Sequence, residues 1–392
     1  MSGSPLRVLV VDDSRIFRAA LSEALAACPD VQVVGSVFSG EQALDFCRRS
    51  PPDLVTLDLH MPGLSGLETL RSLREAPLAS GPSTPATPGV LVVSTLTRAG
   101  AEITLQALQA GAFDFIHKPE GPDPAANSRA LRRQLLEKLS VFRAGRRPPT
   151  PRPNPLAPAP AVRPAPPAPP APSGSAGSRL GATQWAIPAG GATRFRAVVI
   201  GASTGGPAAL AQLLPQIAPH SPVPVFVVTH LLAGFSEFLA ESLQRRCPEA
   251  QIVEAGEGVI AGPRQVFLAP SGRHLRLRLR GNQLCTALDD SPPELGFRPA
   301  ADVLFRSAAE TLRDRVLAVV LTGMDRDGTR GAVAIRDAGG HVVVQDEASS
   351  VVWGMPGSVV AAGAAHEIVP LPQLGATLRR HLGSPSPAPG SR

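Results

Sequence analysis

The chain has 392 residues, which is enough for two or three domains. Its N-terminus does not resemble a signal peptide, and no apolar run approaches the roughly 18 residues of a membrane helix. We therefore expect a soluble cytoplasmic protein without membrane insertion. Its formal net charge of +6 is concentrated in residues 143–196, which hold eight arginines and no acidic residue, so we expect no nucleic-acid partner. The four cysteines are scattered without a C-x-x-C pair, which argues against a disulfide framework or a zinc site.

The N-terminal part alternates β-rich runs with helical patterns. Strands are predicted at 6–11, 31–34, 54–57, 90–93 and 113–116. Helices are predicted after the N-cap residue Ser14 and at 40–49, 65–75, 101–110 and 127–142. This alternation implies an α/β unit with a parallel sheet and helices on both faces.

Polar side chains follow the predicted strands where ligands of a parallel sheet bind, beyond the carboxyl ends. They are Asp12, Asp13, Asp58, Ser94, Thr95 and Lys118. Carboxylates gathered in one pocket repel each other unless a cation lies among them, and hard oxygen ligands suit Mg²⁺. A lysine and a hydroxyl opposite would complete a phosphoryl site. Taken one at a time, each of these residues could also have an ordinary structural role, as a helix cap or as part of a loop.

This set resembles the receiver domain of two-component response regulators over about residues 5–125. The resemblance implies a flavodoxin-like fold with Asp58 as the phospho-acceptor and Ser94 and Lys118 as the switch and phosphate-binding residues. It also implies Mg²⁺ as a cofactor, with ligands from Asp12, Asp13, Asp58 and the backbone carbonyl of His60. A Pro/Ser/Thr-rich insertion at 77–89 lengthens a loop at the opposite end of the sheet and is expected to leave this site intact.

Residues 143–195 are of low complexity, with thirteen prolines between Pro148 and Pro172 alone. Such a segment cannot build a core and is expected to act as a semi-rigid linker. Residues 383–392 have a similarly disordered composition.

Alternation resumes after the linker. Strands are predicted at 197–201, 223–229, 316–321 and 341–344, and helices at 207–217, 235–245, 300–312, 329–338 and from about 356. Between them lie a β-rich stretch at 266–269 and an alternating run at 274–280 that is followed by Gly281-Asn282, typical of an antiparallel hairpin. We expect a second, doubly wound parallel α/β domain with a hairpin insertion.

The turn at Gly201–Pro207 places Ser203 between a strand and a helix N-terminus. His230 ends another predicted strand, and Asp325 and Asp327 follow a third. A hydroxyl, an imidazole and a carboxylate at one sheet edge form the set needed for nucleophilic acyl transfer, with backbone N–H groups of the helix start available for an oxyanion.

This turn has three other interpretations. A nucleotide-binding glycine loop is disfavoured because the spacing is not G-x-G-x-x-G and no lysine follows. An ordinary α/β-hydrolase has the chain order serine, acid, histidine, whereas the order here is Ser203, His230, Asp327. A histidine at a strand end is also commonly a satisfied core residue.

The whole chain resembles the chemotaxis response-regulator protein-glutamate methylesterases, the CheB-type enzymes with an associated glutamine deamidase activity. The resemblance rests on Gly201–Gly206, on Leu321–Gly328, and on Gln345–Ser349 followed by Gly354-Met355-Pro356. It implies Ser203 as nucleophile, His230 as general base and Asp327 as the residue that orients the base, with Thr204 and Met324 as site neighbours.

Two positions depart from the family pattern. Thr229-His230-Leu231-Leu232 replaces the usual Gln-His-Met-Pro, and Asp325 stands where the family has glycine. Asp325 is expected to raise the pKa of His230 or to compete for its N–H.

The resemblance implies a domain order of receiver (1–125, with a closing helix to about 142), linker (143–195), methylesterase (196–382) and tail (383–392). It implies a phosphorylation-activated hydrolase that demethylates glutamate γ-methyl esters and deamidates glutamines on chemoreceptors. A chemotaxis histidine kinase would be the phosphodonor, and the esterase reaction would need no cofactor. The alternative is a response regulator whose output domain is catalytically vestigial and acts by binding a protein or a nucleotide.

Overall fold

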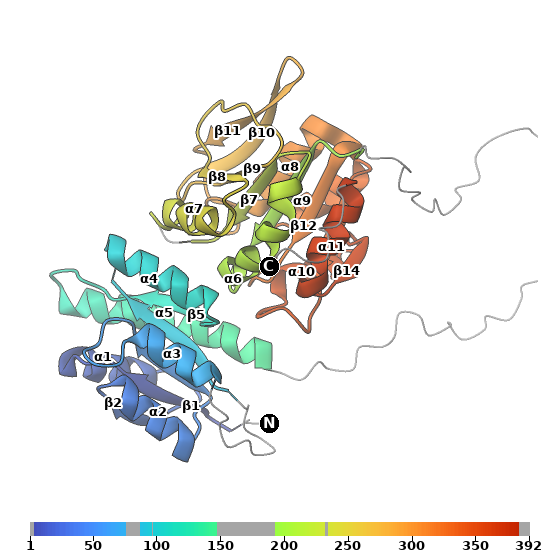
Figure 1. The fold of residues 1–392 in the computed structure, drawn as a ribbon. Coiled ribbons are helices and arrows are strands. Elements are labelled where there is room, and N and C mark those ends of the chain that lie inside the picture. The colour runs from blue at the N-terminus through green and yellow to red at the C-terminus, as the bar shows by residue number, and fades with distance from the viewer. Residues whose placement is uncertain (1–3, 76–86, 96, 147–192, 232–233, 384–392) are drawn as a thin grey trace, which may run out of the picture.

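The structure, a computed structural model, describes residues 4–75, 87–95, 97–146, 193–231 and 234–383 (Figure 1). Most of the predicted insertion at 77–89, nearly all of the predicted linker and most of the tail lie outside these residues. The described chain forms two α/β units, residues 4–146 and residues 193–383, each built on its own sheet.

The N-terminal unit is a five-stranded parallel sheet in the order β2-β1-β3-β4-β5. Its strands are β1 (Leu6–Val11), β2 (Val31–Val37), β3 (Leu54–Asp58), β4 (Gly89–Ser94) and β5 (Asp114–His117). Its helices are α1 (Arg15–Ala26), α2 (Gly40–Arg49), α3 (Gly66–Glu75), α4 (Arg98–Gln109) and α5 (Pro124–Arg146). This is the flavodoxin-like order, so the predicted fold of this unit is confirmed.

Local sequence explains how this unit presents its ligand edge. Ser14 caps α1 by accepting a hydrogen bond from the amide of Phe17, so the chain turns into a helix directly after Asp12 and Asp13. A Cβ at Gly66 would lie 2.0 Å from the carbonyl oxygen of Asp58, so only glycine lets α3 start this close to the end of β3.

The C-terminal unit is a seven-stranded, fully parallel sheet in the order β14-β13-β12-β6-β7-β9-β8. Its strands are β6 (Ala197–Ala202), β7 (Val225–Thr229), β8 (Gln251–Glu254), β9 (Gln265–Leu268), β12 (Val316–Val320), β13 (His341–Gln345) and β14 (Glu367–Val369). Strands β10 (His274–Arg280) and β11 (Gln283–Asp289) form a separate antiparallel hairpin, as predicted.

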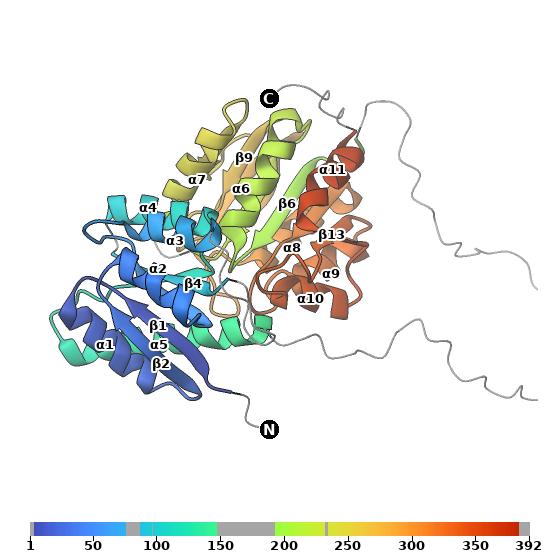
Figure 2. The ribbon, with the colours of Figure 1, turned by 60° about the horizontal axis from the view of Figure 1, so that its bottom comes forward.

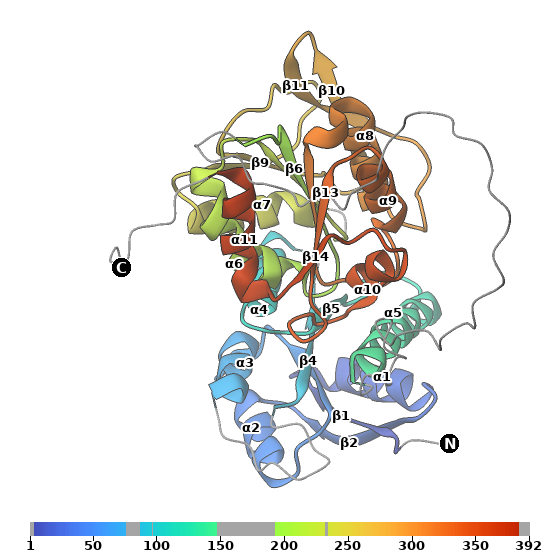
Figure 3. The same ribbon diagram turned by 90° about the vertical axis from the view of Figure 1, so that its right-hand side faces the viewer.

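Helices cover both faces of this larger sheet, which makes it doubly wound. One face packs against α6 (Gly206–Ile217), α7 (Phe235–Arg246) and α11 (Leu371–Leu382). The other packs against α8 (Ala301–Leu312), α9 (Thr329–Asp337) and α10 (Gly354–Ala361), with the two sets on opposite sides of the sheet in Figure 3. Strands β6, β7 and β12 in the middle are buried throughout, as a parallel sheet covered on both faces requires.

A helix does begin near the predicted residue 356, but the prediction that it is the last element is wrong. Helix α10 ends at Ala361, the chain turns at Gly363 with a φ of +65°, and the short strand β14 precedes α11. Glycine adopts this backbone conformation more readily than other residues, and Pro370, which has no N–H to donate to a strand ladder, follows β14 as the N-cap of α11. The four-residue edge strand β8 was also missed because its exposed residues carry little hydrophobic signal.

The two units are in direct contact. Helix α4 of the first packs against α6 and α7 of the second, and the views in Figures 1 and 2 agree on this arrangement. Phe115 of β5 stacks on Phe235 of α7 with ring centroids 5.1 Å apart. None of the described helices is long and apolar enough to span a membrane. All four cysteines are buried and free.

Candidate active site

Ser203 lies in the tight turn between β6 and α6. Gly205 takes a left-handed conformation with a φ of +78°, and a Cβ there would lie 2.7 Å from Val351, so this position requires glycine. The Ser203 amide donates to the carbonyl oxygen of Thr322 at 3.0 Å, and the Ser203 carbonyl accepts from the amide of Gly206 at 2.7 Å. The serine is thus held at the carboxyl end of β6 and at the N-terminus of α6.

His230 and Asp327 meet Ser203 at the same sheet edge. They follow β7 and β12, the two strands that flank β6. The His230 Nδ1 atom lies 3.2 Å from the Ser203 Oγ, and its Nε2 atom lies 2.8 Å from the Asp327 Oδ2. These distances form a continuous hydroxyl–imidazole–carboxylate chain, which is the arrangement that activates a serine nucleophile.

Asp327 is held as a buried carboxylate. Besides His230, it accepts hydrogen bonds from the amides of Ala301 at 2.6 Å, Asp302 at 2.9 Å and Gly328 at 2.8 Å. Burial alone would raise its pKa, but the hydrogen bond and charge of His230 and the two amides at the start of α8 outweigh it, so the pKa of Asp327 is lowered. The negative charge needed to orient the imidazole is therefore kept.

Phe297 fixes the plane of the His230 ring. The two rings stack with centroids 3.8 Å apart and an interplanar angle of 5°. Phe297 lies in the loop between β11 and α8, and the sequence contains no local signal that a residue there would contact His230. Sequence reasoning missed it for that reason.

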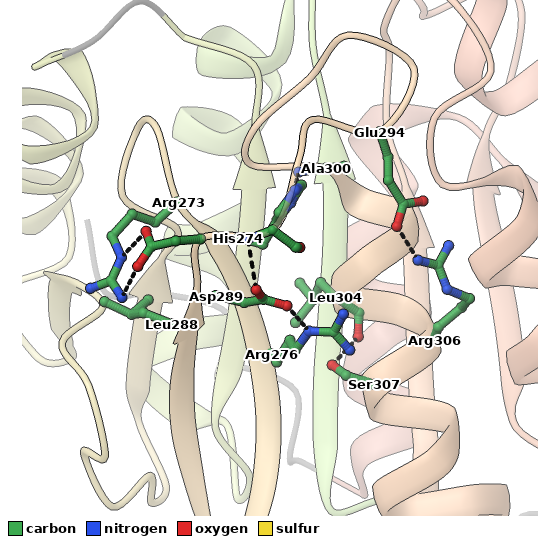
Figure 4. A network of polar contacts seen from close by, with 12 residues as sticks. Arg273, His274, Arg276, Leu288, Asp289, Glu294, Ala300, Leu304, Arg306 and Ser307 are labelled. Atoms are coloured by element: carbon green, nitrogen blue, oxygen red, sulfur yellow. Dashed lines mark hydrogen bonds and ion pairs between the residues drawn. The ribbon is translucent and has the colours of Figure 1, made fainter.

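A polar network holds the loop that carries Phe297 (Figure 4). Glu294 and Phe297 exchange backbone hydrogen bonds of 3.1 and 2.9 Å, and Glu294 is ion-paired with Arg306 of α8. At the end of this loop, the Ala300 amide donates to the buried His274 Nδ1 at 3.1 Å. The loop is therefore tied both to α8 and to the hairpin.

Asp325 does not compete with Asp327 for His230, so that expectation is wrong. The side chain of Asp325 is exposed, and its Oδ1 accepts from the amide of Arg326 at 2.9 Å. Both ring nitrogens of His230 are engaged by Ser203 and Asp327.

Thr204 and Met324 both line a cavity of about 230 Å³ together with Ser203 and His230. Residues of the first unit line the same cavity, among them Asp114 and Lys138. The buried Thr204 Oγ1 donates to the Asp114 Oδ2 at 2.9 Å, and the Lys138 Nζ lies 3.0 Å from the same oxygen. Thr204 and Met324 therefore lie close to Ser203 and His230, and the Thr204 hydroxyl faces the other unit.

The ligand edge of the first unit brings together the residues predicted there. The Lys118 Nζ lies 2.7 Å from the Asp58 Oδ2 and 2.8 Å from the Asp12 Oδ2. The His60 amide donates to the Asp58 Oδ1 at 3.2 Å, while the buried Ser94 hydroxyl donates to the carbonyls of Thr95 and Gly100.

Carboxylate oxygens of Asp12, Asp13 and Asp58 lie within 4.8 Å of one another. This all-oxygen donor set fits Mg²⁺, which is bound at about 2.0–2.1 Å by carboxylates and waters. Burial, together with the charge of Asp58, raises the pKa of Asp12 despite its contact with Lys118. A divalent cation would relieve this crowding of negative charge.

Two family models match the chain: the response regulator receiver domain over residues 8–127 and the CheB methylesterase over residues 198–378. Similar full-length proteins are known as protein-glutamate methylesterase/protein-glutamine glutaminase. The protein from Rhodopseudomonas palustris is 41% identical over 378 residues, covering 96% of this chain and 94% of its own. That from Nocardioides is 41% identical over 383 residues, covering 98% and 97% of the two chains, and that from Myxococcus xanthus is 41% identical over 382 residues, covering 96% and 97%. The chain therefore belongs to the CheB-type family of methylesterases that carry an N-terminal receiver domain.

Proposed function

We propose that Ser203, His230 and Asp327 hydrolyse the γ-methyl ester of modified glutamates on methyl-accepting chemoreceptors, and that the same residues release ammonia from specific glutamine side chains. The observation that carries this proposal is the hydrogen-bonded chain from Ser203 through His230 to Asp327 at one sheet edge. The similar proteins are known as protein-glutamate methylesterase/protein-glutamine glutaminase, and that name supplies the substrate classes.

In the proposed reaction, the Ser203 Oγ attacks the ester carbonyl while the His230 Nδ1 accepts the serine proton. Asp327 stabilises the imidazolium that forms, and backbone N–H groups at the start of α6 stabilise the oxyanion. The imidazolium then protonates the leaving oxygen, and methanol departs. Water attacks the acyl-enzyme with His230 again as base, which regenerates Ser203 and leaves glutamate. With a glutamine substrate the leaving group is ammonia.

We propose that the unphosphorylated receiver restrains this site by covering it. The cavity beside Ser203 is closed on one side by α4, β5 and α5, and the buried hydrogen bond from Thr204 to Asp114 fastens the two units next to the nucleophile. Phosphorylation of Asp58 by a chemotaxis histidine kinase would weaken this cover. Bound Mg²⁺ would neutralise charge on the entering phosphoryl group, with Asp12, Asp13, Asp58 and the His60 carbonyl as its ligands.

Lys118 is suited to the phosphate of a modified Asp58. Burial by itself would lower the pKa of its amine, but the hydrogen bonds and charge interactions with Asp12 and Asp58 have the larger, opposite effect. The pKa of Lys118 is therefore raised and the group stays cationic.

We propose four segments for the chain: a receiver (1–125, closing helix to about 142), a linker (143–195), a methylesterase (196–382) and a tail (383–392). In this proposal the protein must meet both the histidine kinase that phosphorylates it and the receptor glutamates that it modifies. We therefore propose that it is located in the cytoplasm.

The test measures methanol release from a methylated receptor by the purified full chain, with and without a small-molecule phosphodonor. Wild type is expected to release methanol faster with the phosphodonor, Asp58→Asn to keep only the basal rate, and Ser203→Ala to release none. A fluorophosphonate probe should label wild type and not Ser203→Ala. A protein that neither releases methanol nor reacts with the probe would instead be a vestigial output domain that acts by binding.

A further inference from the structure

Three of the eight histidines gather at the edge of the larger sheet opposite to Ser203. His341 begins β13, His366 precedes β14, and His381 lies in the last turn of α11. The His341 ring lies 4.6 Å from that of His366 and 4.5 Å from that of His381, measured between centroids. The proposed reaction uses none of them.

Glu367, the first residue of β14, joins two of these imidazoles. Its Oε1 lies 2.9 Å from the His341 Nε2 and 2.6 Å from the His381 Nε2, and the three atoms all lie within 4.8 Å of one another. One carboxylate oxygen of Glu367 therefore bridges the two imidazoles.

We propose that His341, Glu367 and His381 bind a divalent metal ion of the zinc class. Two imidazole nitrogens and one carboxylate oxygen are a ligand set that Zn²⁺ and Co²⁺ favour, whereas Mg²⁺ prefers oxygen alone. The scattered cysteines argue against a zinc site with thiolate ligands. That argument does not apply to this cluster, because none of its three residues is a cysteine.

The geometry needs little adjustment to hold such an ion. Tetrahedral bonds of about 2.0–2.1 Å place neighbouring ligand atoms about 3.3 Å apart, so Glu367 must withdraw by roughly half an ångström. Glu367 can move because 32% of its side chain is exposed, whereas the His341 side chain is only 7% exposed and is held in place by its neighbours. Exposure on the Glu367 side also leaves room for a water as the fourth ligand.

His366 is placed to support the site without being a ligand. Its Nδ1 accepts the amide of Val342 at 3.0 Å, which fixes the ring beside His341.

A bound ion would join three elements that are separate in sequence: β13, β14 and α11. The first described residues of the C-terminal unit also meet here, since the Thr193 hydroxyl donates to the His381 carbonyl at 3.2 Å. The ion would therefore pin the end of α11 and the point where the chain enters this unit, and its role would be structural.

The test uses the full chain, stripped of metal with a chelator and kept in excess Mg²⁺ so that the receiver carboxylates are occupied. Co²⁺ is titrated by visible absorption and Zn²⁺ by calorimetry. We expect one ion per chain with micromolar or tighter affinity, and a higher midpoint of thermal unfolding with the metal. His381→Gln and Glu367→Gln should each weaken binding roughly 100-fold.

Two matched variants locate the site. His220→Gln and His230→Gln should each bind the ion within about 2-fold of wild type, because neither residue belongs to the cluster. X-ray absorption of the Zn²⁺-loaded wild type, which depends on no variant, should show two imidazoles at about 2.0 Å. The proposal is overturned by the absence of stoichiometric binding, by an oxygen-only coordination shell, or by binding that survives in Glu367→Gln and is lost in His230→Gln.

Discussion

The contact between Thr204 and Asp114 offers the sharpest test of how the receiver restrains the esterase. The two side chains are buried, with relative exposures of 7% and 6%, and Thr204 adjoins the proposed nucleophile. Thr204→Val keeps the shape of the side chain and removes only the hydroxyl that donates to Asp114. The substitution therefore weakens the covered arrangement without opening a cavity.

The free-energy loss expected for Thr204→Val depends on the contacts that Asp114 retains in the variant. A hydrogen bond to a charged group is worth about 1.5–3 kcal/mol. In the variant, Asp114 still contacts the Lys138 Nζ at 3.0 Å and accepts the amide of Phe115 at 2.8 Å, so its charge is not left unpaired. We therefore expect a loss of about 1–2 kcal/mol, which raises the ratio of uncovered to covered protein by about 5- to 30-fold.

The assay is methanol release by the full chain without phosphodonor, where the basal rate follows the uncovered fraction. Thr204→Val should raise this rate by about 5- to 30-fold, up to the rate of the C-terminal unit alone. Glu102→Gln is the matched control: Glu102 of α4 pairs with Arg245 at 3.0 Å across the same interface, but both side chains are about half exposed. Such a pair is worth less than about 1 kcal/mol, so the control should change the rate by less than about 5-fold.

Thr204 also adjoins Ser203, so the substitution is repeated in a chain that starts at residue 193. A catalytic effect of the hydroxyl would change the rate of this fragment, whereas loss of the interface would leave it unchanged. An unaltered basal rate in the full-length variant, or an equal change in the fragment, would refute the reasoning.

Two further predictions concern the buried carboxylates. Asp327→Asn should lower kcat for methanol release by about 10³–10⁴-fold while circular dichroism stays that of wild type, because the amide cannot fix the His230 tautomer; a loss below about 10-fold would contradict the proposed role. Burial raises the pKa of Asp302 to about 6, above the 3.8 of a free aspartate. Ionising this buried group therefore lowers the free energy of unfolding progressively as the pH rises from about 4 to 6, and the full loss persists at any pH above 6. Asp302→Asn removes this cost and can still accept the Gly331 amide. Its free energy of unfolding in urea should therefore exceed that of wild type by about 3 kcal/mol at pH 7 and approach it near pH 4, and a pH-independent difference would exclude this cause.

Much of the fold could be predicted because its signals are local. Apolar runs in the central strands, the cap at Ser14 and the turn at Gly205 each act through residues a few positions apart, and these elements appear close to the predicted bounds. The errors lie where local signals are weak. The exposed edge strand β8 carries little apolar pattern, and the alanine-rich run around Gly363 favours one long helix by propensity. The turn at Gly363 and the pairing of β14 with β13 divide that run instead.

The sequence by itself determined which side chains reach the two ligand edges. In a parallel sheet the strand ends and the loops that follow them lie at the carboxyl edge. That rule places Ser203, His230 and the loop with Asp327 at the edge of one sheet, and Asp12, Asp58 and Lys118 at the edge of the other. The family motif pointed to Asp327 as the acid that partners the base, and the tertiary structure shows the physical reason. The Asp327 carboxylate contacts His230, whereas Asp325, two residues earlier, accepts from the Arg326 amide. The tertiary structure alone brought Phe297 onto His230, Asp114 onto Thr204, and Glu367 between two histidines. These contacts join residues distant in sequence, and their partners are set by how helices and loops pack, which no periodicity of a single chain segment encodes.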